Sequence, residues 1–264
     1  PMLKVCPECG SPYIGTFGLG TQKVEAALYK EFPQAKVLRM DMDTTKKKDS
    51  HEQILSAFAN EEADILVGTQ MIVKGHDFPG VTLVGVLAAD LSLYISDYRA
   101  SERTFQLLTQ AAGRAGRGDI PGNVIIQTYD PDHYSITTAK EQNYEAFYGQ
   151  EIEYRKMMRY PPVWNMLYIL CASKNEAAAS EAAVALMGKI DQIVRENSEK
   201  IFSIGPSDAP VAKISDVYRK VIYVKTREYQ TLVILKDGLE AFVKDNRLYQ
   251  NVAVGFDFNP VNGF

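Results

Sequence analysis

The stretch "QLLTQAAGRAGRGDIPGNV" (residues 106–124) joins the end of a predicted helix to the start of a predicted strand. Phe105 and Leu108 lie three residues apart and begin an apolar helical face that alanines continue. Three glycines then interrupt this face beside Arg114 and Arg117. Because a glycine inside a helix costs about 1 kcal/mol relative to alanine, we expect these glycines to serve a purpose other than helix stability.

Outward from this stretch, short apolar runs alternate with helical patterns between Gly20 and about Thr138. The runs are continuous, which is typical of strands buried on both faces of a parallel sheet. Repeated strand–helix units predict a doubly wound α/β sheet, in which ligands bind beyond the carboxyl ends of the strands. The predicted strands are 35–40, 63–68, 81–90 and 123–129, and the predicted helices are 21–32, 51–60 and 102–115.

The rest of the chain follows a different pattern. Residues 139–163 are polar and predict a helical linker, which ends at the two prolines of "RYPPVW" (159–164) because proline does not fit inside a helix. Residues 164–264 then show the order β-α-β-β-α-β, which predicts a smaller α+β domain of the ferredoxin-like type. Its predicted strands are 166–172, 201–214, 218–226 and 251–258, and its predicted helices are 176–196 and 228–245.

Composition limits the class of protein. No apolar run approaches the roughly 18 residues of a membrane span, so we expect no membrane contact. Three cysteines in 264 residues do not form a disulfide framework, which favours a cytoplasmic location. The net charge is −4, so any nucleic-acid site must be a local basic patch. Because Pro1 precedes Met2 and two cysteines follow closely, we expect an excised piece of a longer protein.

A glycine turn at "FGLGTQ" (17–22) partly matches the dinucleotide-binding fingerprint. Asp41 follows about twenty residues later, after a predicted strand, where that fingerprint has an acidic residue. Lys23, however, occupies the position of the third glycine and would block close packing of helix on strand. A nicotinamide-dependent oxidoreductase is therefore a less favoured alternative, and an ordinary strand-to-helix turn explains the pattern as well.

A second candidate site is "DILVGTQMIVKGHDFPG" (64–80), where a predicted strand ends at a loop. Lys74, His76 and Asp77 cluster in this loop, at the edge where sites form on such sheets. A solvated loop would explain these charges. It would not explain Gly75 between two of them, which indicates a backbone that lies close to a ligand.

The third candidate is the opening stretch itself. If the helix continues, Gln110, Arg114 and Arg117 share one face at positions i, i+4 and i+7. Small neighbours would then let two guanidinium groups reach one polyphosphate. The alternative is a solvated arginine face at a fraying helix end, which would not require the glycines.

A basic strand in the second domain, "KISDVYRKVIYVKTR" (213–227), carries interleaved tyrosines. Strand alternation puts Tyr218 and Lys220 on one face and Arg219, Tyr223 and Lys225 on the other. Basic and aromatic side chains together suit single-stranded DNA, whose bases stack and whose phosphates pair with cations. A solvated strand explains the pattern nearly as well.

The sequence also resembles a known family. "QAAGRAGRG" resembles the sixth signature motif of the second helicase superfamily, and "GTQMIVKGHDFP" resembles the fifth in the form found in bacterial replication-restart helicases. The resemblance covers essentially the whole chain, and implies a RecA-like second motor lobe at 20–138 and a C-terminal domain. Residues 1–19 would be the remainder of a cysteine-containing zinc module and the return into the motor lobe. Further matching segments are "CPECGS", "GLGTQKVEAAL", "LRMDMDTT", "PGNVIIQTYDPDHY", "RKMMRYPP", "IGPSDAP" and "DFNPVNGF".

The resemblance implies roles for particular residues. Arg117 would match the arginine finger, which contributes roughly 10³–10⁵ in rate. Arg114 would face the phosphates, Gln110 would orient the arginines or contact the nucleotide, and Gly75 and Asp77 would lie near the nucleotide ribose. The DNA backbone contacts that it implies are Thr69 and Lys74 and, less directly, the segment of Arg39, Asp41, Asp43 and Thr44.

Two departures from that family limit the expected activity. The sequence contains no G-x-x-x-x-G-K-[ST] loop to hold the β- and γ-phosphates and magnesium, so we expect the chain alone not to hydrolyse ATP. Cys6 and Cys9 supply only half of a four-ligand zinc site, and we expect that half-site to be empty in this chain. Cys171 falls in a predicted strand and is expected to pack as a small apolar residue.

Cofactors and partners also follow from the resemblance. The intact protein would use ATP, Mg²⁺ and Zn²⁺, and would act on branched forks and single-stranded DNA. Primosome proteins and single-strand DNA-binding protein would be its protein partners. The alternative class is a non-catalytic RecA-like module that only docks DNA or protein, although such a module would not need a pair of phosphate-facing arginines.

Overall fold

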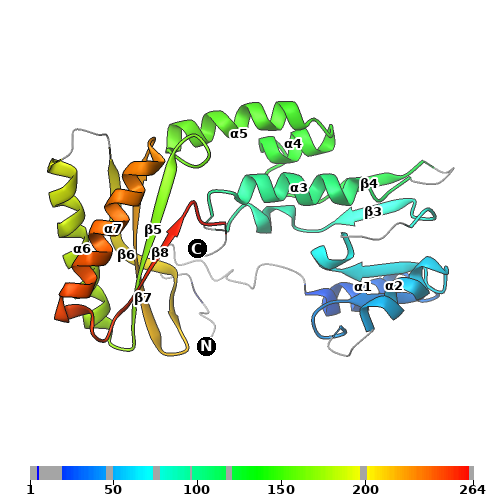
Figure 1. Cartoon of the computed structure of the whole chain (residues 1–264). Helices are drawn as coiled ribbons and strands as arrows, with labels where there is room; N and C mark the ends of the chain where they lie inside the picture. The colour runs from blue at the N-terminus through cyan, green and yellow to red at the C-terminus, as the bar shows by residue number, and fades with distance from the viewer. Residues whose placement is uncertain are drawn as a thin grey trace. The chain divides into compact units, whose positions relative to one another are not determined.

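The computed structural model describes residues 20–45, 50–73, 78–95, 97–116, 121–196 and 201–261, together with Val5. The chain forms two compact units (Figure 1). Unit 1 comprises Pro1–Ile95 and Arg99–Phe147, and unit 2 comprises Ser96–Tyr98 and Tyr148–Phe264. The change from unit 1 to unit 2 at Phe147 falls inside one helix, within the stretch expected to be a linker.

Unit 1 follows the predicted alternation of strands and helices. Each predicted strand and helix has a counterpart within a few residues of its expected bounds, and the strands are shorter than expected. The elements are α1 (Thr21–Glu31), β1 (Val37–Met40), α2 (Ser50–Ala59), β2 (Ile65–Gly68), the short 3₁₀ helices η1 (Gln70–Val73) and η2 (Ala89–Ser92), β3 (Leu83–Val86), α3 (Ala100–Ala112), β4 (Asn123–Ile126), α4 (Tyr134–Lys140) and the start of α5 (Tyr144–Met158).

The strands of unit 1 pair in parallel, which confirms the α/β class. They form two pairs: β1 lies beside β2 with Met40 opposite Gly68, and β3 lies beside β4 with Val86 opposite Ile126. The prediction that the strands are buried on both faces is wrong for β3 and β4. Their Val86 and Ile126 pack on Phe105 and Leu108 of α3, but Leu83 and Ile125 on the opposite face are 59% and 62% exposed. Within the described residues, helices cover only one face of this pair.

The β1–β2 pair has its own small core. Met40 and Leu55 are buried there together with Phe78, whose ring lies edge-on to that of Phe58 at a centroid distance of 5.1 Å. Aromatic pairs favour this edge-to-face arrangement because the ring edge is electropositive and the ring face electronegative. Phe78 thereby fixes the chain at the end of the loop that carries the second candidate site.

Unit 2 has the predicted ferredoxin-like topology. Its four-stranded antiparallel sheet has the order β6-β7-β5-β8, so that the first and third strands of the domain lie in the centre. Each element matches its expected range closely. The elements are the remainder of α5, β5 (Asn165–Ser173), α6 (Glu176–Glu196), β6 (Phe202–Ile214), β7 (Val217–Thr226), α7 (Tyr229–Asp245), the 3₁₀ helix η3 (Arg247–Tyr249) and β8 (Ala253–Phe258).

The main core of unit 2 lies between this sheet and helices α6 and α7. Leu167 and Ile169 of β5 and Ile222 of β7 are fully buried against Leu186 of α6 and Leu235 of α7. The intervening residues of β5 and β7 form, with Ala209 of β6, a second, smaller cluster on the other face of the sheet, and Tyr168 and Val221 are its other buried members. The period of two along each strand therefore decides which side chains meet the helices.

Cys171 lies in the main core, as expected, and is fully buried. Burial raises the pKa of its thiol to about 12, so the reactive thiolate form is disfavoured at neutral pH. No helix among the described residues combines the length and apolar character needed to cross a membrane.

Candidate functional site

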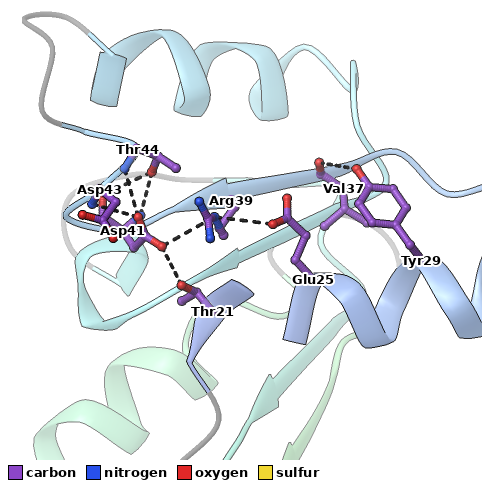
Figure 2. A network of polar contacts seen from close by, with 8 residues as sticks. All are labelled: Thr21, Glu25, Tyr29, Val37, Arg39, Asp41, Asp43 and Thr44. Carbon is purple, nitrogen blue, oxygen red and sulfur yellow. Dashed lines mark hydrogen bonds and ion pairs between the residues drawn. The ribbon is translucent and has the colours of Figure 1, made fainter. Parts of the chain in front are cut away.

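Asp41 organises the turn that follows β1 (Figure 2). Its Oδ1 accepts hydrogen bonds from the backbone N–H groups of Asp43 and Thr44, each at 2.9 Å, and its Oδ2 accepts one from the Thr21 hydroxyl at 2.5 Å. The bond from Thr21, followed by that from Thr44, lowers the pKa of Asp41 to about 2. Asp41 thus links the start of α1 to the end of β1.

Arg39 belongs to the same network. Its Nε lies 3.5 Å from a carboxylate oxygen of Glu25 and 3.5 Å from one of Asp41, and only 15% of its side chain is exposed (Figure 2). Two carboxylates therefore compensate its charge. The sequence placed Arg39 and Thr44 together as DNA contacts. The structure brings both to the carboxyl end of β1, where Thr44 accepts a hydrogen bond from the N–H of Asp41 and supports the turn.

Asp90 has the corresponding role at the ends of β3 and β4. It is fully buried, and its carboxylate accepts hydrogen bonds from the Thr128 hydroxyl at 2.5 Å and from the backbone N–H groups of Tyr129 and Asp130 at 3.0 and 3.2 Å. Burial alone would raise the pKa of Asp90, but these hydrogen bonds outweigh it and lower the pKa. Asp90 therefore joins the two strand ends and has a structural role.

The helical face expected for Gln110 and Arg114 does not form as predicted. Helix α3 ends at Ala112 with Gly113 as its C-cap, so exposed Gln110 lies in its last turn and half-buried Arg114 lies beyond it. A regular spacing of i and i+4 on one helix therefore does not hold for Gln110 and Arg114. Arg117 lies outside the described residues.

The structure also gives a different reason for one of the glycines. Gly116 has a φ of +71°, which favours glycine, and its N–H donates to the carbonyl of Val81 at 3.0 Å. A Cβ atom on Gly116 would lie 2.5 Å from the backbone nitrogen of Gly122. Gly116 thus lets two backbone segments cross, whereas the sequence had indicated room for a ligand.

Several predicted site residues lie outside the part of the chain that the structure describes. They are Lys74, Gly75, His76 and Asp77 of the second candidate site and the cysteines Cys6 and Cys9. Thr69, the remaining residue predicted there, is exposed directly after β2. Gly68 before it fits tightly, because a Cβ atom there would lie 2.6 Å from the carbonyl oxygen of Met40.

The basic strand β7 presents fewer free cations than expected. The ammonium group of Lys220 lies 2.5 Å from Asp208 and 3.5 Å from Glu176, and these partners raise the pKa of Lys220. Lys225 is only 5% exposed and donates to the carbonyl of Met158 at 3.2 Å, so a DNA contact through Lys225 would require this region to open. Burial is the physical reason that the prediction for Lys225 does not fit this structure.

The other two residues of the predicted patch keep some exposure. The ring of Tyr223 meets that of Tyr168 edge-on at a centroid distance of 5.6 Å, and is half-buried. Arg219 is also half-buried and donates from Nη1 to the carbonyl of Val211 at 3.3 Å. Of the three predicted cations, Arg219 is the one that neither pairs with a described carboxylate nor lies in the interior.

The sequence reasoning missed a cation–aromatic cluster around Trp164. The guanidinium of Arg159 lies 3.5 Å from the ring centroid of Phe202, and that of Arg227 lies 5.3 Å from the ring centroid of Trp164. Both arginines are exposed, and among the described residues no carboxylate pairs with either. The signal in the sequence was the combination of arginine and tryptophan in "RYPPVW", which had been used only to place a boundary.

No group of three or more potential metal ligands occurs within the described ranges. For a nucleotide, exposed Gln110 and half-buried Arg114 offer hydrogen-bond donors at the end of α3, which fits a role beside phosphates. The sequence has no loop to hold the phosphates or magnesium from the opposite side.

In comparisons with known proteins, two family models match successive parts of the chain. Residues 16–119 match the family model "Helicase conserved C-terminal domain", and residues 156–261 match "Primosomal protein N C-terminal domain". The chain is 47% identical over 262 residues to the replication restart protein PriA of Bacillus subtilis, 45% identical over 231 residues to that of Synechocystis and 36% identical over 261 residues to that of Chlamydia trachomatis. These alignments cover 98%, 88% and 98% of this chain but 32%, 27% and 34% of the relatives, so the chain spans about a third of their length.

Proposed function

Because this chain belongs to the family of the replication restart protein PriA, we propose that it forms the second motor lobe and the C-terminal domain of an ATP-dependent DNA helicase. In this proposal the intact cytoplasmic protein restarts stalled replication forks and assembles the primosome. The observation that carries the proposal is the order of the two matches, with a helicase domain at 16–119 followed by a primosomal domain at 156–261.

The proposed catalytic residues lie at and beyond the end of α3. Gln110 is exposed in the last turn and can contact or orient groups beside it, and Arg114 is half-buried two residues past the helix. Arg117 acts as the arginine finger, whose planar fork donates to the phosphate oxygens that gain charge in the transition state. ATP with Mg²⁺ supplies the phosphoryl group, and the first lobe of the intact protein holds its phosphates.

The proposed nucleotide and DNA contacts come from both units. Gly75 and Asp77 lie near the ribose, and Lys74 and exposed Thr69 contact the DNA backbone. Of the three cations predicted on β7, half-buried Arg219 is the one best placed to meet phosphates, since described carboxylates do not neutralise it. The proposed partners are forked and single-stranded DNA, primosome proteins and single-strand DNA-binding protein. Zinc is held by Cys6 and Cys9 together with further ligands of the intact protein.

ATP hydrolysis by the intact protein tests this proposal. Replacing Arg117 by lysine keeps the charge but removes the planar fork, so kcat should fall at least about tenfold while KM for ATP stays nearly unchanged. Arg195→Lys, at an exposed position in the last turn of α6, is the matched control and should leave both constants as they are. A strong rise in KM with unchanged kcat would make Arg117 a binding residue.

A second experiment distinguishes a motor lobe from a module that only docks DNA or protein. This chain, mixed with a separately produced first lobe, should hydrolyse ATP in the presence of DNA, whereas either part alone should not. If DNA binds but no combination hydrolyses ATP, the chain is a non-catalytic module and the proposed function is wrong.

A further inference from the structure

Three residues, Ser96–Tyr98, belong to unit 2 although the residues on both sides of them belong to unit 1. The chain therefore passes from unit 1 to unit 2 before Ser96, returns after Tyr98, and passes to unit 2 again after Phe147. The excursion at Ser96–Tyr98 directly precedes α3, which begins at Ala100. A link of this kind gives unit 2 a covalent connection to the helix that carries the proposed catalytic residues.

Tyr98 makes the contacts that hold this segment in unit 2. Its ring stacks on that of Tyr160 at a centroid distance of 5.2 Å with an interplanar angle of 18°. The guanidinium of Arg155 lies 5.4 Å from the centroid of the same ring, and the Tyr98 hydroxyl donates to the carbonyl of Pro260 at 3.3 Å. Tyr98 thus meets two segments of unit 2 that are distant in sequence, one at residues 155–160 and one at Pro260.

The partners of Tyr98 are themselves fixed. Arg155 is buried, and donates from Nε to Glu151 at 2.6 Å and from Nη1 to the carbonyl of Pro161 at 3.0 Å. Tyr160 is covered on its ring by the ammonium of Lys225 at 3.8 Å. Because an ion pair holds Arg155 and the Lys225 ammonium covers Tyr160, the groups that contact the Tyr98 ring are held in place, which makes them a firm anchor for Tyr98.

Within unit 1, the start of α3 is held just as closely. The Thr104 hydroxyl donates to Ser92 Oγ at 2.8 Å, and Ser92 donates to the carbonyl of Ala89, beside the buried Asp90. The segment from Leu93 to Arg99 is therefore anchored at one end in unit 1 and through Tyr98 in unit 2. From Ala100 the 13 residues of α3 extend about 20 Å, at 1.5 Å per residue, to the end that precedes Arg114.

We propose that Tyr98 is a positioning residue that couples unit 2 to the catalytic end of α3. DNA held by unit 2 biases the placement of α3 through the Tyr98 anchor, and α3 transmits the bias as a rigid element to Gln110 and the arginines beyond it. This inference rests on the proposed function, since it assumes that those residues take part in ATP hydrolysis. It assigns to Tyr98 no contact with ATP or DNA.

Steady-state ATP hydrolysis by the intact protein, with and without single-stranded DNA, tests the coupling. Tyr98→Ala removes the stacked ring and should lower the ratio of DNA-stimulated to basal kcat at least about twofold. Basal kcat and KM for ATP should stay unchanged, since the chemistry is not touched. Tyr98→Phe keeps the ring and should retain most of the stimulation. Tyr94→Ala, on the same segment but 71% exposed, is the matched control and should behave as the wild type.

Hydrogen exchange measured on this chain tests the anchor without reference to ATP. Tyr98→Ala should speed amide exchange in residues 93–99, whereas Tyr94→Ala should not, and an unchanged fluorescence of Trp164 would show that unit 2 remains folded. Unchanged stimulation by DNA in Tyr98→Ala overturns the coupling, and unchanged exchange overturns the anchor. Absence of DNA-stimulated hydrolysis in the wild type would instead contradict the proposed function, and the exchange experiment would still decide on the anchor.

Discussion

The ammonium group of Lys225 lies 3.8 Å from the centroid of the Tyr160 ring and donates to the carbonyl of Met158 at 3.2 Å. A lysine predicted to meet DNA is therefore buried against the chain that connects α5 to the sheet of unit 2. Burial, with a smaller contribution from the nearby Arg159, lowers the pKa of Lys225 to about 8. Fully buried lysines are rare. Because folding lowers the pKa of Lys225, its titration should be visible in the stability of unit 2.

The contribution of Lys225 to the free energy of unfolding of unit 2 should rise with pH between about 8 and the ordinary lysine pKa of 10.5. Cys171, whose pKa burial raises from 9.0, acts in the opposite direction, so the comparison is made between the wild type and a variant that keeps Cys171. In this range the unfolded chain binds the proton more tightly than the folded chain, so raising the pH removes a proton that favours unfolding. Urea denaturation followed by the fluorescence of Trp164, the one tryptophan of the chain, measures this. Lys225→Met lacks the group and should gain less stability from pH 7 to 9.5. An equal gain in both proteins would show that Lys225 does not titrate in this range.

Gly116→Ala should destabilise unit 1 by about 1–3 kcal/mol, because alanine is strained at a positive φ and its Cβ would meet the backbone of Gly122. Thermal unfolding followed by far-UV circular dichroism measures the loss. Gly85→Ala is the control, since no atom lies within 4 Å of its added Cβ, and should change stability by no more than about 0.5 kcal/mol. Equal melting temperatures for the two variants would rule out the proposed backbone crossing.

Asp41→Asn should lower the stability of unit 1 most at neutral pH and least in acid. The hydrogen bonds from Thr21 and the following turn lower the pKa of Asp41 to about 2, so its contribution is complete above its ordinary pKa of 3.8 and is lost as pH falls through 2. Denaturation curves from pH 7 to pH 2 should therefore converge for wild type and variant. Asp132→Asn, which changes an exposed carboxylate, is the control and should follow the wild type throughout. A pH-independent difference for Asp41→Asn would contradict the titration.

Arg219→Gln should weaken single-stranded DNA binding more than Lys220→Gln. Arg219 bonds a backbone carbonyl, whereas two carboxylates already compensate the charge of Lys220. Fluorescence anisotropy with a labelled oligonucleotide over a range of salt concentrations should show that Arg219→Gln reduces the salt slope by about 0.7–1, the loss of one phosphate contact. A larger effect from Lys220→Gln would show that its ion pairs open to bind DNA.

The sequence by itself determined the classes of structure and their order. Continuous apolar runs separated by helical periods predicted parallel strands in unit 1, and the order of elements after Trp164 predicted the ferredoxin-like unit 2, because both patterns depend on local periods of two and 3.6 residues. The motifs near Gly75 and Arg117 indicated the family, since short motifs are readable without knowing how the chain folds.

Only the tertiary structure decided which charged side chains remain available to a ligand and which glycines the backbone requires. Whether Lys225 meets solvent depends on the chain that covers it, and whether Arg39 is neutralised depends on Glu25 from another element. Gly116 is needed because the backbone of Gly122, six residues further along, lies against it, a contact that the helical period did not predict. Burial and ion pairing, in contrast, arise between segments distant in sequence. The sequence therefore predicted the kinds of residues at the site, and packing determined which of them remain available.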